Sequence, residues 1–242
     1  MRRNTARLVS FSGIDGAGKS TQIQALESHL QRLGFRTTIY TFWDDVVVFP
    51  SLREFISHKV FQGDKGVGSP EKPITRRDKN VSSWYTAIAR SLLYLLDALN
   101  LRLFLARLAS VGSADFIIFD RYIYDELANL RLNSWLARTY ARLLIRLSPR
   151  PDIAFLVDAD PETARSRKPE YPLQFLRQNR EAYLKLGEFI REMTIVDPLS
   201  IKETTLRITE LMSIVRSHLD IPSANLETES FAAPGQSVSS ND

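Results

Sequence analysis

The sequence predicts an α/β fold, a doubly wound parallel β-sheet with helices on both faces. Short apolar runs alternate along the chain with segments of helical periodicity, as they do when crossover helices join parallel strands. Two of these runs, 116–119 and 153–157, are unbroken, which is the pattern of strands buried on both faces. A glycine-rich turn at 13–20 follows the first run, and ligands of such sheets bind beyond the carboxyl ends of the strands. The turn therefore marks the predicted site.

Each element is predicted from its own residues. Strands are expected where β-branched, aromatic or apolar residues cluster, at 8–11, 37–42, 116–119, 153–157 and 194–196. The first helix follows the glycine-rich turn, carries its apolar residues on one face and ends at Gly34. Further helices are expected at 51–61, 82–108, 127–147, 161–190 and 201–219, with a break near Pro169 and Pro172. The segment 62–81 is rich in glycine and proline and predicts a surface loop.

The composition fits one globular domain. The chain has 242 residues, of which 44% are hydrophobic and 25% charged, and these values exclude a wholly disordered or fibrous protein. It has no cysteine, which excludes disulfides, thiolate zinc sites and cysteine nucleophiles and suits a reducing compartment. The net charge of +4 is a modest excess that does not indicate nucleic-acid binding. We expect residues 1–220 to form a single domain and residues 221–242 to form a disordered tail.

The sequence does not predict a membrane protein. Residues 1–7 are basic, but no apolar segment follows them as it would in a signal peptide. The most apolar stretch, 87–108, carries Arg90, Asp97, Arg102 and Arg107, and these charges do not fit a membrane span. We therefore expect a soluble protein of the cytoplasm.

The glycine-rich turn, residues 13–20, reads Gly-Ile-Asp-Gly-Ala-Gly-Lys-Ser and matches the P-loop pattern G-x-x-x-x-G-K-[ST]. Glycines let consecutive backbone N–H groups approach a phosphate, and the helix that follows adds the partial positive charge of its N-terminus. The predicted ATP-binding residues are Gly13, Asp15, Gly16, Ala17, Gly18, Lys19, Ser20 and Thr21. In this site Lys19 would bridge the β- and γ-phosphates, and the hydroxyl of Ser20 would bind Mg²⁺.

A second motif, Asp120-Arg121-Tyr122, ends the buried strand 116–119. An aspartate in this place, beside a P-loop, suits contact with Mg²⁺ or with an acceptor, and Arg121 would bind a second anionic group. The chain has no N-K-x-D string for reading guanine, and its second long apolar strand is not followed by the adjacent acids common in oligomeric ATPases. These features favour a small-molecule kinase over a GTPase or a motor ATPase.

Together with a third motif, these residues resemble the thymidylate kinase family of nucleoside monophosphate kinases. The segment 158–167 begins Asp-Ala-Asp-Pro-Glu and resembles the lid signature of that family, which is followed by arginines. Phe175, Arg180 and Tyr183 repeat the family's F-x-x-x-x-R-x-x-Y spacing. The resemblance runs from about 8 to 219 and is dense at the P-loop, at the D-R-Y motif and at the lid.

The resemblance implies transfer of the γ-phosphoryl group of ATP, with Mg²⁺, to a nucleoside monophosphate, by default thymidylate. It also implies a homodimer formed through the long helix. The implied catalytic residues are Asp15, Lys19, Arg121, Arg165 and Arg167. Asp15 matches an acid that approaches the acceptor's sugar, and Gly16 occupies the place where one branch of the family has a catalytic arginine. In the other branch that charge comes from the lid, here about 159–172, which contains Arg165 and Arg167.

The acceptor half departs from the family. Where the family has R-E-P-G-G after the second strand, this chain has Thr41-Phe42-Trp43-Asp44-Asp45, and Ala98 replaces the arginine of an A-D-R triplet. Arg90 or Arg102 on the long helix could compensate. The predicted acceptor-binding residues are Asp15, Arg53, Arg90, Asp120, Arg121 and Tyr122, and the predicted metal ligands are Ser20 and Asp120.

The departures leave two alternatives open. The acceptor could be another nucleotide, a nucleoside or a small hydroxyl metabolite. Alternatively, the protein could bind a nucleotide without catalysis and use the basic stripe of Arg138, Arg142 and Arg146 as a partner surface.

Overall fold

A single parallel sheet organises the computed structural model, which describes residues 6–49, 84–112, 114–130, 132, 134–191 and 193–217. The five strands lie in the order β2-β3-β1-β4-β5, and every neighbouring pair is parallel. They are β1 (Arg7–Ser12), β2 (Thr37–Thr41), β3 (Phe116–Asp120), β4 (Ile153–Val157) and β5 (Met193–Val196). The predicted doubly wound parallel sheet is confirmed.

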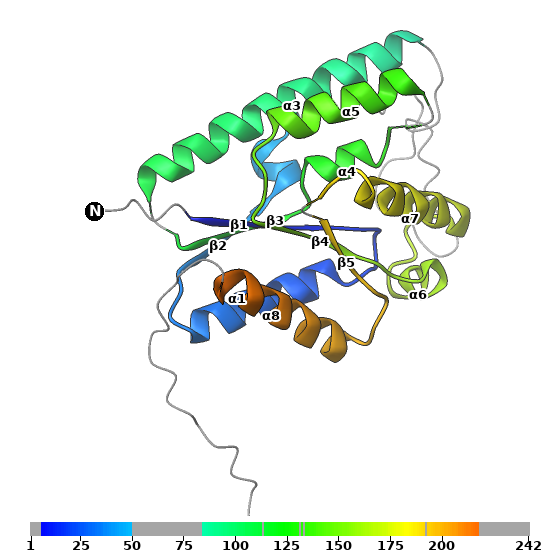
Figure 1. Ribbon diagram of the computed structural model, residues 1–242. Helices are drawn as coiled ribbons and strands as arrows, with labels where there is room; N and C mark the ends of the chain where they lie inside the picture. Colours follow the sequence, from blue (N-terminus) through cyan, green and yellow to red (C-terminus); the bar gives the residue numbers. More distant parts are fainter. Residues whose placement is uncertain are drawn as a thin grey trace, which may run out of the picture.

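Helices cover both faces of the sheet (Figure 1). The helices α1 (Lys19–Arg32) and α8 (Ile201–Ser217) lie together on one face. The other face carries α3 (Trp84–Val111), α4 (Ile123–Leu127), α5 (Trp135–Leu147) and α7 (Leu173–Gly187). The short helix α6 (Pro161–Arg167) lies at the carboxyl ends of the strands, where the predicted site is located.

The core lies on both sides of the central strands. All residues of β4 and the first four of β3 are buried, as their unbroken apolar sequences predict. Aromatic rings fill the space beside them, with Phe11 and Phe155 at a centroid distance of 5.1 Å and Phe119 and Tyr122 at 5.5 Å. This packing fixes the strand ends that carry the site residues.

Two predicted elements are wrong in their bounds. The helix predicted at 127–147 begins only at Trp135, because Ser134 starts α5 by accepting a hydrogen bond from the backbone N–H of Ala137 at 3.2 Å, and Leu127 is the last residue of the separate helix α4. The second strand ends one residue earlier than predicted. After it the chain forms a π-helical turn, η1 (Phe42–Val46), in which Asp45 accepts a hydrogen bond from the N–H of Thr41 at 2.6 Å.

The break predicted near Pro169 and Pro172 is confirmed, since α6 ends at Arg167 and α7 begins at Leu173. The helix predicted at 51–61, the loop at 62–81 and the tail at 221–242 lie outside the described residues, as does Arg53. Across the part of the chain that is described, no helix combines the length and the apolar character needed to span a membrane.

Candidate active site

Three neighbouring strands bring the sequence motifs together at one edge of the sheet. Strand β1 lies between β3 and β4, and the register pairs Phe11 with Asp120 and Ser12 with Leu156. The P-loop therefore follows β1 beside the D-R-Y motif of β3 and beside the lid signature that follows β4. A ligand of a doubly wound sheet binds at this kind of edge.

The P-loop is closely packed and ends in a buried lysine. Gly13 has a φ of +142°, and a Cβ there would lie 2.4 Å from the carbonyl oxygen of Val157. The Nζ of Lys19 donates hydrogen bonds to the carbonyl oxygens of Gly13 at 2.9 Å and of Ile14 at 2.8 Å. Burial, followed by the charge of Arg121, lowers the pKa of Lys19 to about 8. The N-terminal N–H groups of α1 begin at the same point and suit a phosphate.

Ser20 and Asp120 lie close enough to share a cation. The hydroxyl of Ser20 donates to Oδ2 of Asp120 at 3.5 Å, a long hydrogen bond. Mg²⁺ binds oxygen ligands and commonly takes only one or two from protein, with phosphates and water supplying the rest. Within the described ranges no cluster of three or more His, Cys, Asp or Glu side chains could hold a metal. The pair fits a magnesium ion that is held jointly with a nucleotide.

The guanidinium of Arg121 lies between two carboxylates. Its Nη1 donates to Asp125 at 3.1 Å, and its Nη2 forms an ion pair with Asp15 on the P-loop. Burial alone would lower the pKa of Arg121, but the charges of Asp125 and Asp15 outweigh burial and raise the pKa above its ordinary value. The backbone also holds this residue, since Arg121 has a φ of +68° and its N–H donates to the carbonyl of Phe11 at 2.9 Å. A fixed, charged donor therefore faces the P-loop.

Sequence reasoning missed Asp125, the most heavily bonded residue of the site. Its carboxylate is buried and accepts hydrogen bonds from the hydroxyl of Ser12 at 2.7 Å, from the N–H of Tyr122 at 2.9 Å and from the hydroxyl of Tyr183 at 2.6 Å. The bond from Arg121 is the fourth. The one available signal was the i,i+4 spacing of Arg121 and Asp125 in the sequence, although Arg121 itself precedes α4.

Residues of the lid signature bind residues of α7. Arg180 donates to both carboxylate oxygens of Asp158, from Nε at 2.7 Å and from Nη2 at 2.6 Å. Arg177 forms an ion pair with Glu162 of α6. The Asp158 pair is bidentate and half-buried, whereas the Glu162 pair is exposed and contributes little to stability. The lid signature thus joins the end of β4 and helix α6 to α7.

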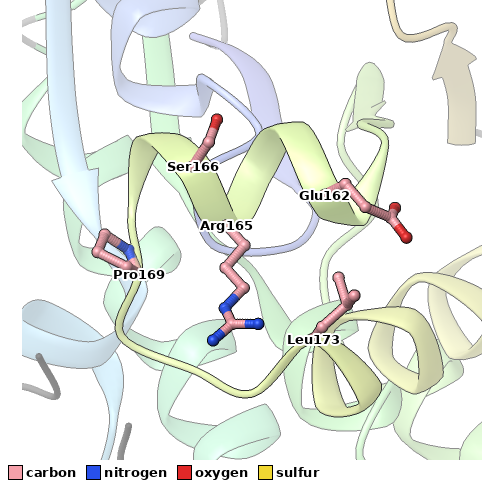
Figure 2. A pocket seen from close by; sticks show the side chains of 5 residues that line it. All are labelled: Glu162, Arg165, Ser166, Pro169 and Leu173. Atoms are coloured by element: carbon pink, nitrogen blue, oxygen red, sulfur yellow. The ribbon is translucent and has the colours of Figure 1, made fainter. Parts of the chain in front are cut away.

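The two lid arginines are placed differently. Figure 2 shows Arg165 pointing toward Leu173, into a shallow pocket of about 460 Å³ between α6 and the start of α7. Arg167 lies at the exposed end of α6. Neither guanidinium forms an ion pair with another residue of the described segments. Both residues belong to the helix that lies against the P-loop at Gly16, but Arg165 faces α7 in this conformation.

Helix α6 packs directly against the P-loop at Gly16. This glycine has a φ of +85°, and a Cβ there would lie 2.2 Å from the carbonyl oxygen of Ala164, which is fully buried. No side chain, and therefore no arginine, fits at position 16 while α6 occupies this place. The glycine at the position where one branch of the family has an arginine thus lets α6 approach the loop.

The predicted acceptor residues are only partly brought to the site. Tyr122 is completely buried, and its hydroxyl donates to the carbonyl of Pro149 at 2.6 Å, so the structure places this side chain in the core. Arg90 lies half-buried near the start of α3. Arg102 donates to the carbonyl of Leu147 at 3.4 Å, at the far end of α5. Asp15, Asp120 and Arg121 do meet at the P-loop.

The position that the family fills with arginine faces the core. Ala98 is fully buried, and its neighbour Asp97 accepts a hydrogen bond from the N–H of Val48 at 2.7 Å. Asn100 donates to the carbonyl of Val46 at 2.6 Å. This part of α3 therefore holds the chain that follows η1.

The strand order, the P-loop and the adjoining D-R-Y motif define a P-loop fold of the nucleoside monophosphate kinase type. Among curated proteins, the chain is 27% identical to a probable thymidylate kinase of Thermococcus kodakarensis, covering 81% of this chain and 91% of that protein. It is 24% identical to a thymidylate kinase of Thermoanaerobacter sp., covering 89% and 96%. No family model matches the chain.

Solved structures give the same result for the fold. A thymidylate kinase from Candida albicans, described as having broad substrate specificity, has a TM-score of 0.58 at 19% identity and covers 88% of this chain and 94% of its own. The thymidylate kinase from Ehrlichia chaffeensis has a TM-score of 0.55 at 14% identity, covering 86% and 98%. The predicted resemblance to thymidylate kinases is confirmed, and these relatives indicate that the chain is a phosphotransferase.

The contact between Gly16 and α6 predicts a specific loss of stability. Gly16→Ala is expected to lower the free energy of unfolding more than Gly34→Ala. The two glycines have φ values of +85° and +83°, so both variants bear a similar backbone strain of about 1–2 kcal/mol. Only at Gly16 would the new Cβ meet a backbone atom, whereas at Gly34 nothing lies within 4 Å. Urea denaturation of both variants measures the difference, and equal losses would contradict the close packing of α6 on the P-loop.

Proposed function

We propose that this protein is an ATP- and Mg²⁺-dependent thymidylate kinase that converts dTMP and ATP into dTDP and ADP. The observation that carries the proposal is the convergence of Lys19 and Ser20 of the P-loop with Asp120 and Arg121 of β3 at one sheet edge. The curated relatives named thymidylate kinase support the choice of acceptor. The single domain 1–220, with a lid at about 159–172, and a cytoplasmic location belong to the same proposal.

The residues act by positioning and by charge. Backbone N–H groups of the P-loop and Lys19 bind the phosphates of ATP, and Ser20 and Asp120 hold the Mg²⁺ that neutralises part of their charge. Arg121 binds the phosphate of the acceptor, and Asp15 lies beside Arg121, where it can contact the sugar. An acceptor phosphate oxygen then attacks the γ-phosphorus, and the bond to the β,γ-bridging oxygen breaks to release ADP. Little covalent chemistry falls to the protein, so geometry and charge set the rate.

The lid supplies the remaining positive charge in this proposal. Gly16 excludes an arginine from the P-loop, and the replacement charge is assigned to the arginines of α6, the helix that packs on Gly16. Arg165 and Arg167 are therefore assigned to the charge that develops on the transferred phosphoryl group. Arg165 has to turn from its pocket beside Leu173 toward the P-loop to take part.

An acceptor panel tests the proposed function. Purified protein is incubated with ATP, Mg²⁺ and each of several nucleoside monophosphates, nucleosides and small hydroxyl compounds, and ADP release is measured. We expect dTMP to react far faster than every other acceptor, and Lys19→Ala to remove turnover because the β- and γ-phosphates lose their cation. If another acceptor reacts faster than dTMP, the departures from the family at Ala98 and η1 would reflect a different substrate specificity. ATP binding without transfer to any acceptor would contradict the kinase and favour the non-catalytic alternative.

The pKa of Lys19 predicts a pH dependence. Because its pKa is lowered to about 8, the free enzyme loses the Lys19 charge as the pH rises through that value. We therefore expect kcat/KM for ATP to fall above pH 8, while kcat falls only at higher pH, because bound phosphates favour the charged amine. Steady-state kinetics between pH 6 and pH 10 measure both profiles, with circular dichroism confirming that the fold persists. A flat kcat/KM profile across this range would contradict the lowered pKa.

The lid arginines predict a loss in turnover rather than in binding. An arginine that contacts the phosphoryl group mainly in the transition state is worth about 10³- to 10⁵-fold in kcat. We expect the double variant Arg165→Ala/Arg167→Ala to lose kcat and kcat/KM together, with ATP affinity little changed. Arg167→Ala is expected to account for more of the loss than Arg165→Ala. Arg177→Ala is the matched control, because it removes an exposed arginine of α7 that already pairs with Glu162. Near wild-type kcat in the double variant would contradict the assignment.

The outer face of α3 is proposed to bind a second copy of the chain. Ile88, Leu92, Leu99 and Leu103 follow helical spacing on this face, and Leu92 and Leu103 are 57% and 56% exposed. The resemblance to thymidylate kinases supports a homodimer here. We expect sedimentation equilibrium to show a dimer that Leu92→Glu/Leu103→Glu converts to a monomer. Leu206→Glu, on α8 at the opposite face, is the control, and a wild-type monomer at micromolar concentration would contradict this interface.

A further inference from the structure

The structure assigns to Asp125 the role of a positioning residue that fixes Arg121 for the acceptor phosphate. The carboxylate of Asp125 lies at the start of α4 and bonds Arg121 Nη1 at 3.1 Å. This inference rests on the proposed function, because it gives the fixed guanidinium an acceptor anion to bind.

The carboxylate is itself held by two other elements, β1 and α7, and by the N-cap of its own helix. Ser12 at the end of β1 and Tyr183 of α7 donate from their hydroxyls at 2.7 Å and 2.6 Å, and Tyr122 donates from its backbone N–H at 2.9 Å. Only 1% of the Asp125 side chain is exposed. A buried carboxylate is costly unless hydrogen bonds and a cation compensate, and here both are present. Asp125 therefore has one position, set by the sheet edge and by α7.

The two carboxylates that flank Arg121 differ in how far they are exposed. Asp15 lies on the P-loop and keeps 21% of its side chain exposed, and in this inference an acceptor phosphate takes its place at Nη2 of Arg121. Asp125 is buried and bonded from other elements, so it keeps its hold on Nη1. A guanidinium is a planar fork of N–H donors, and fixing one arm on Asp125 leaves the rest of the fork for an anion. Without Asp125, the ion pair with Asp15 would be the one remaining ion pair in the described part of the chain that positions the guanidinium of Arg121.

Asp125 also joins the acceptor side of the site to the lid. Tyr183 lies on α7, the helix that binds Asp158 and Glu162 through Arg180 and Arg177. The hydroxyl of Tyr183 is the contact through which this helix reaches the carboxylate that holds Arg121. The position of Arg121 thus depends on α7 as well as on β3.

A double-mutant cycle tests the assignment. Affinity for dTMP is measured by titration calorimetry for the wild type, Asp125→Asn, Arg121→Ala and the combined variant, and kcat and KM for both substrates are measured alongside. Loss of a charge-assisted hydrogen bond should weaken dTMP binding by about 10- to 100-fold in Asp125→Asn. The KM for ATP should stay unchanged. In the Arg121→Ala background the same substitution should change dTMP affinity by no more than about twofold.

Milder variants keep the test decisive if Asp125→Asn fails to fold. Tyr183→Phe and Ser12→Ala each remove one hydrogen bond to the carboxylate and leave its charge in place. Each should weaken dTMP binding severalfold without changing the KM for ATP. Tyr140→Phe is the matched control, because its hydroxyl bonds the carbonyl of Ser91 on α3 and does not touch Asp125. Its dTMP affinity should equal that of the wild type.

The outcomes separate the inference from the proposed function. If the wild type transfers phosphate but Asp125→Asn weakens dTMP binding equally with and without Arg121, the positioning role is overturned and the kinase stands. Equal effects of Tyr183→Phe and Tyr140→Phe would also overturn it. If the wild type binds dTMP without phosphorylating it, the kinase is overturned, while the cycle on affinity still tests Asp125. A wild type without affinity for dTMP overturns both.

Discussion

A cluster of buried and partly buried charges at the carboxyl end of the sheet is the feature on which the site depends. The cations of Lys19 and Arg121 lie among the carboxylates of Asp15, Asp120 and Asp125. Burial disfavours each of these charges, and their mutual attraction with added hydrogen bonds makes the arrangement stable. Burial lowers the pKa of Lys19 to about 8, whereas at Arg121 the neighbouring carboxylates outweigh burial and raise the pKa above its ordinary value. One cluster thus contains both a titratable cation and a permanent one.

This cluster requires that β1, β3 and β4 lie side by side in register. The P-loop follows β1, Arg121 follows β3, and the lid signature follows β4, so the order of strands sets the distances between the charged groups. Ser12 contributes to the same arrangement, since the residue that ends β1 also bonds Asp125. The apolar runs that form the core are therefore also what holds the charged groups together.

Contact between α6 and Gly16 connects the predicted lid to the P-loop. The family resemblance suggested that a glycine at this position shifts the catalytic charge to the lid, and the packing gives a physical reason for the glycine itself, since Ala164 fills the space that a side chain would need. Arg180 and Asp158 tie the same region to α7. The predicted acceptor half also differs from the family. Beside Ala98, where the family has its arginine, Asp97 and Asn100 of α3 bond the end of η1 and the residues that follow it.

The sequence by itself determined the sheet, the P-loop and the D-R-Y motif, because each of them depends on residues that are adjacent or periodically spaced along the chain. Only the tertiary structure showed that Tyr122 is in the core, that Asp125 meets Tyr183 across 58 residues, and that Gly16 touches Ala164. Contacts of this kind depend on strand order and on helix packing, which no local pattern encodes. For that reason the sequence predicted the phosphate-binding residues, while the fold decided which side chains hold them in place.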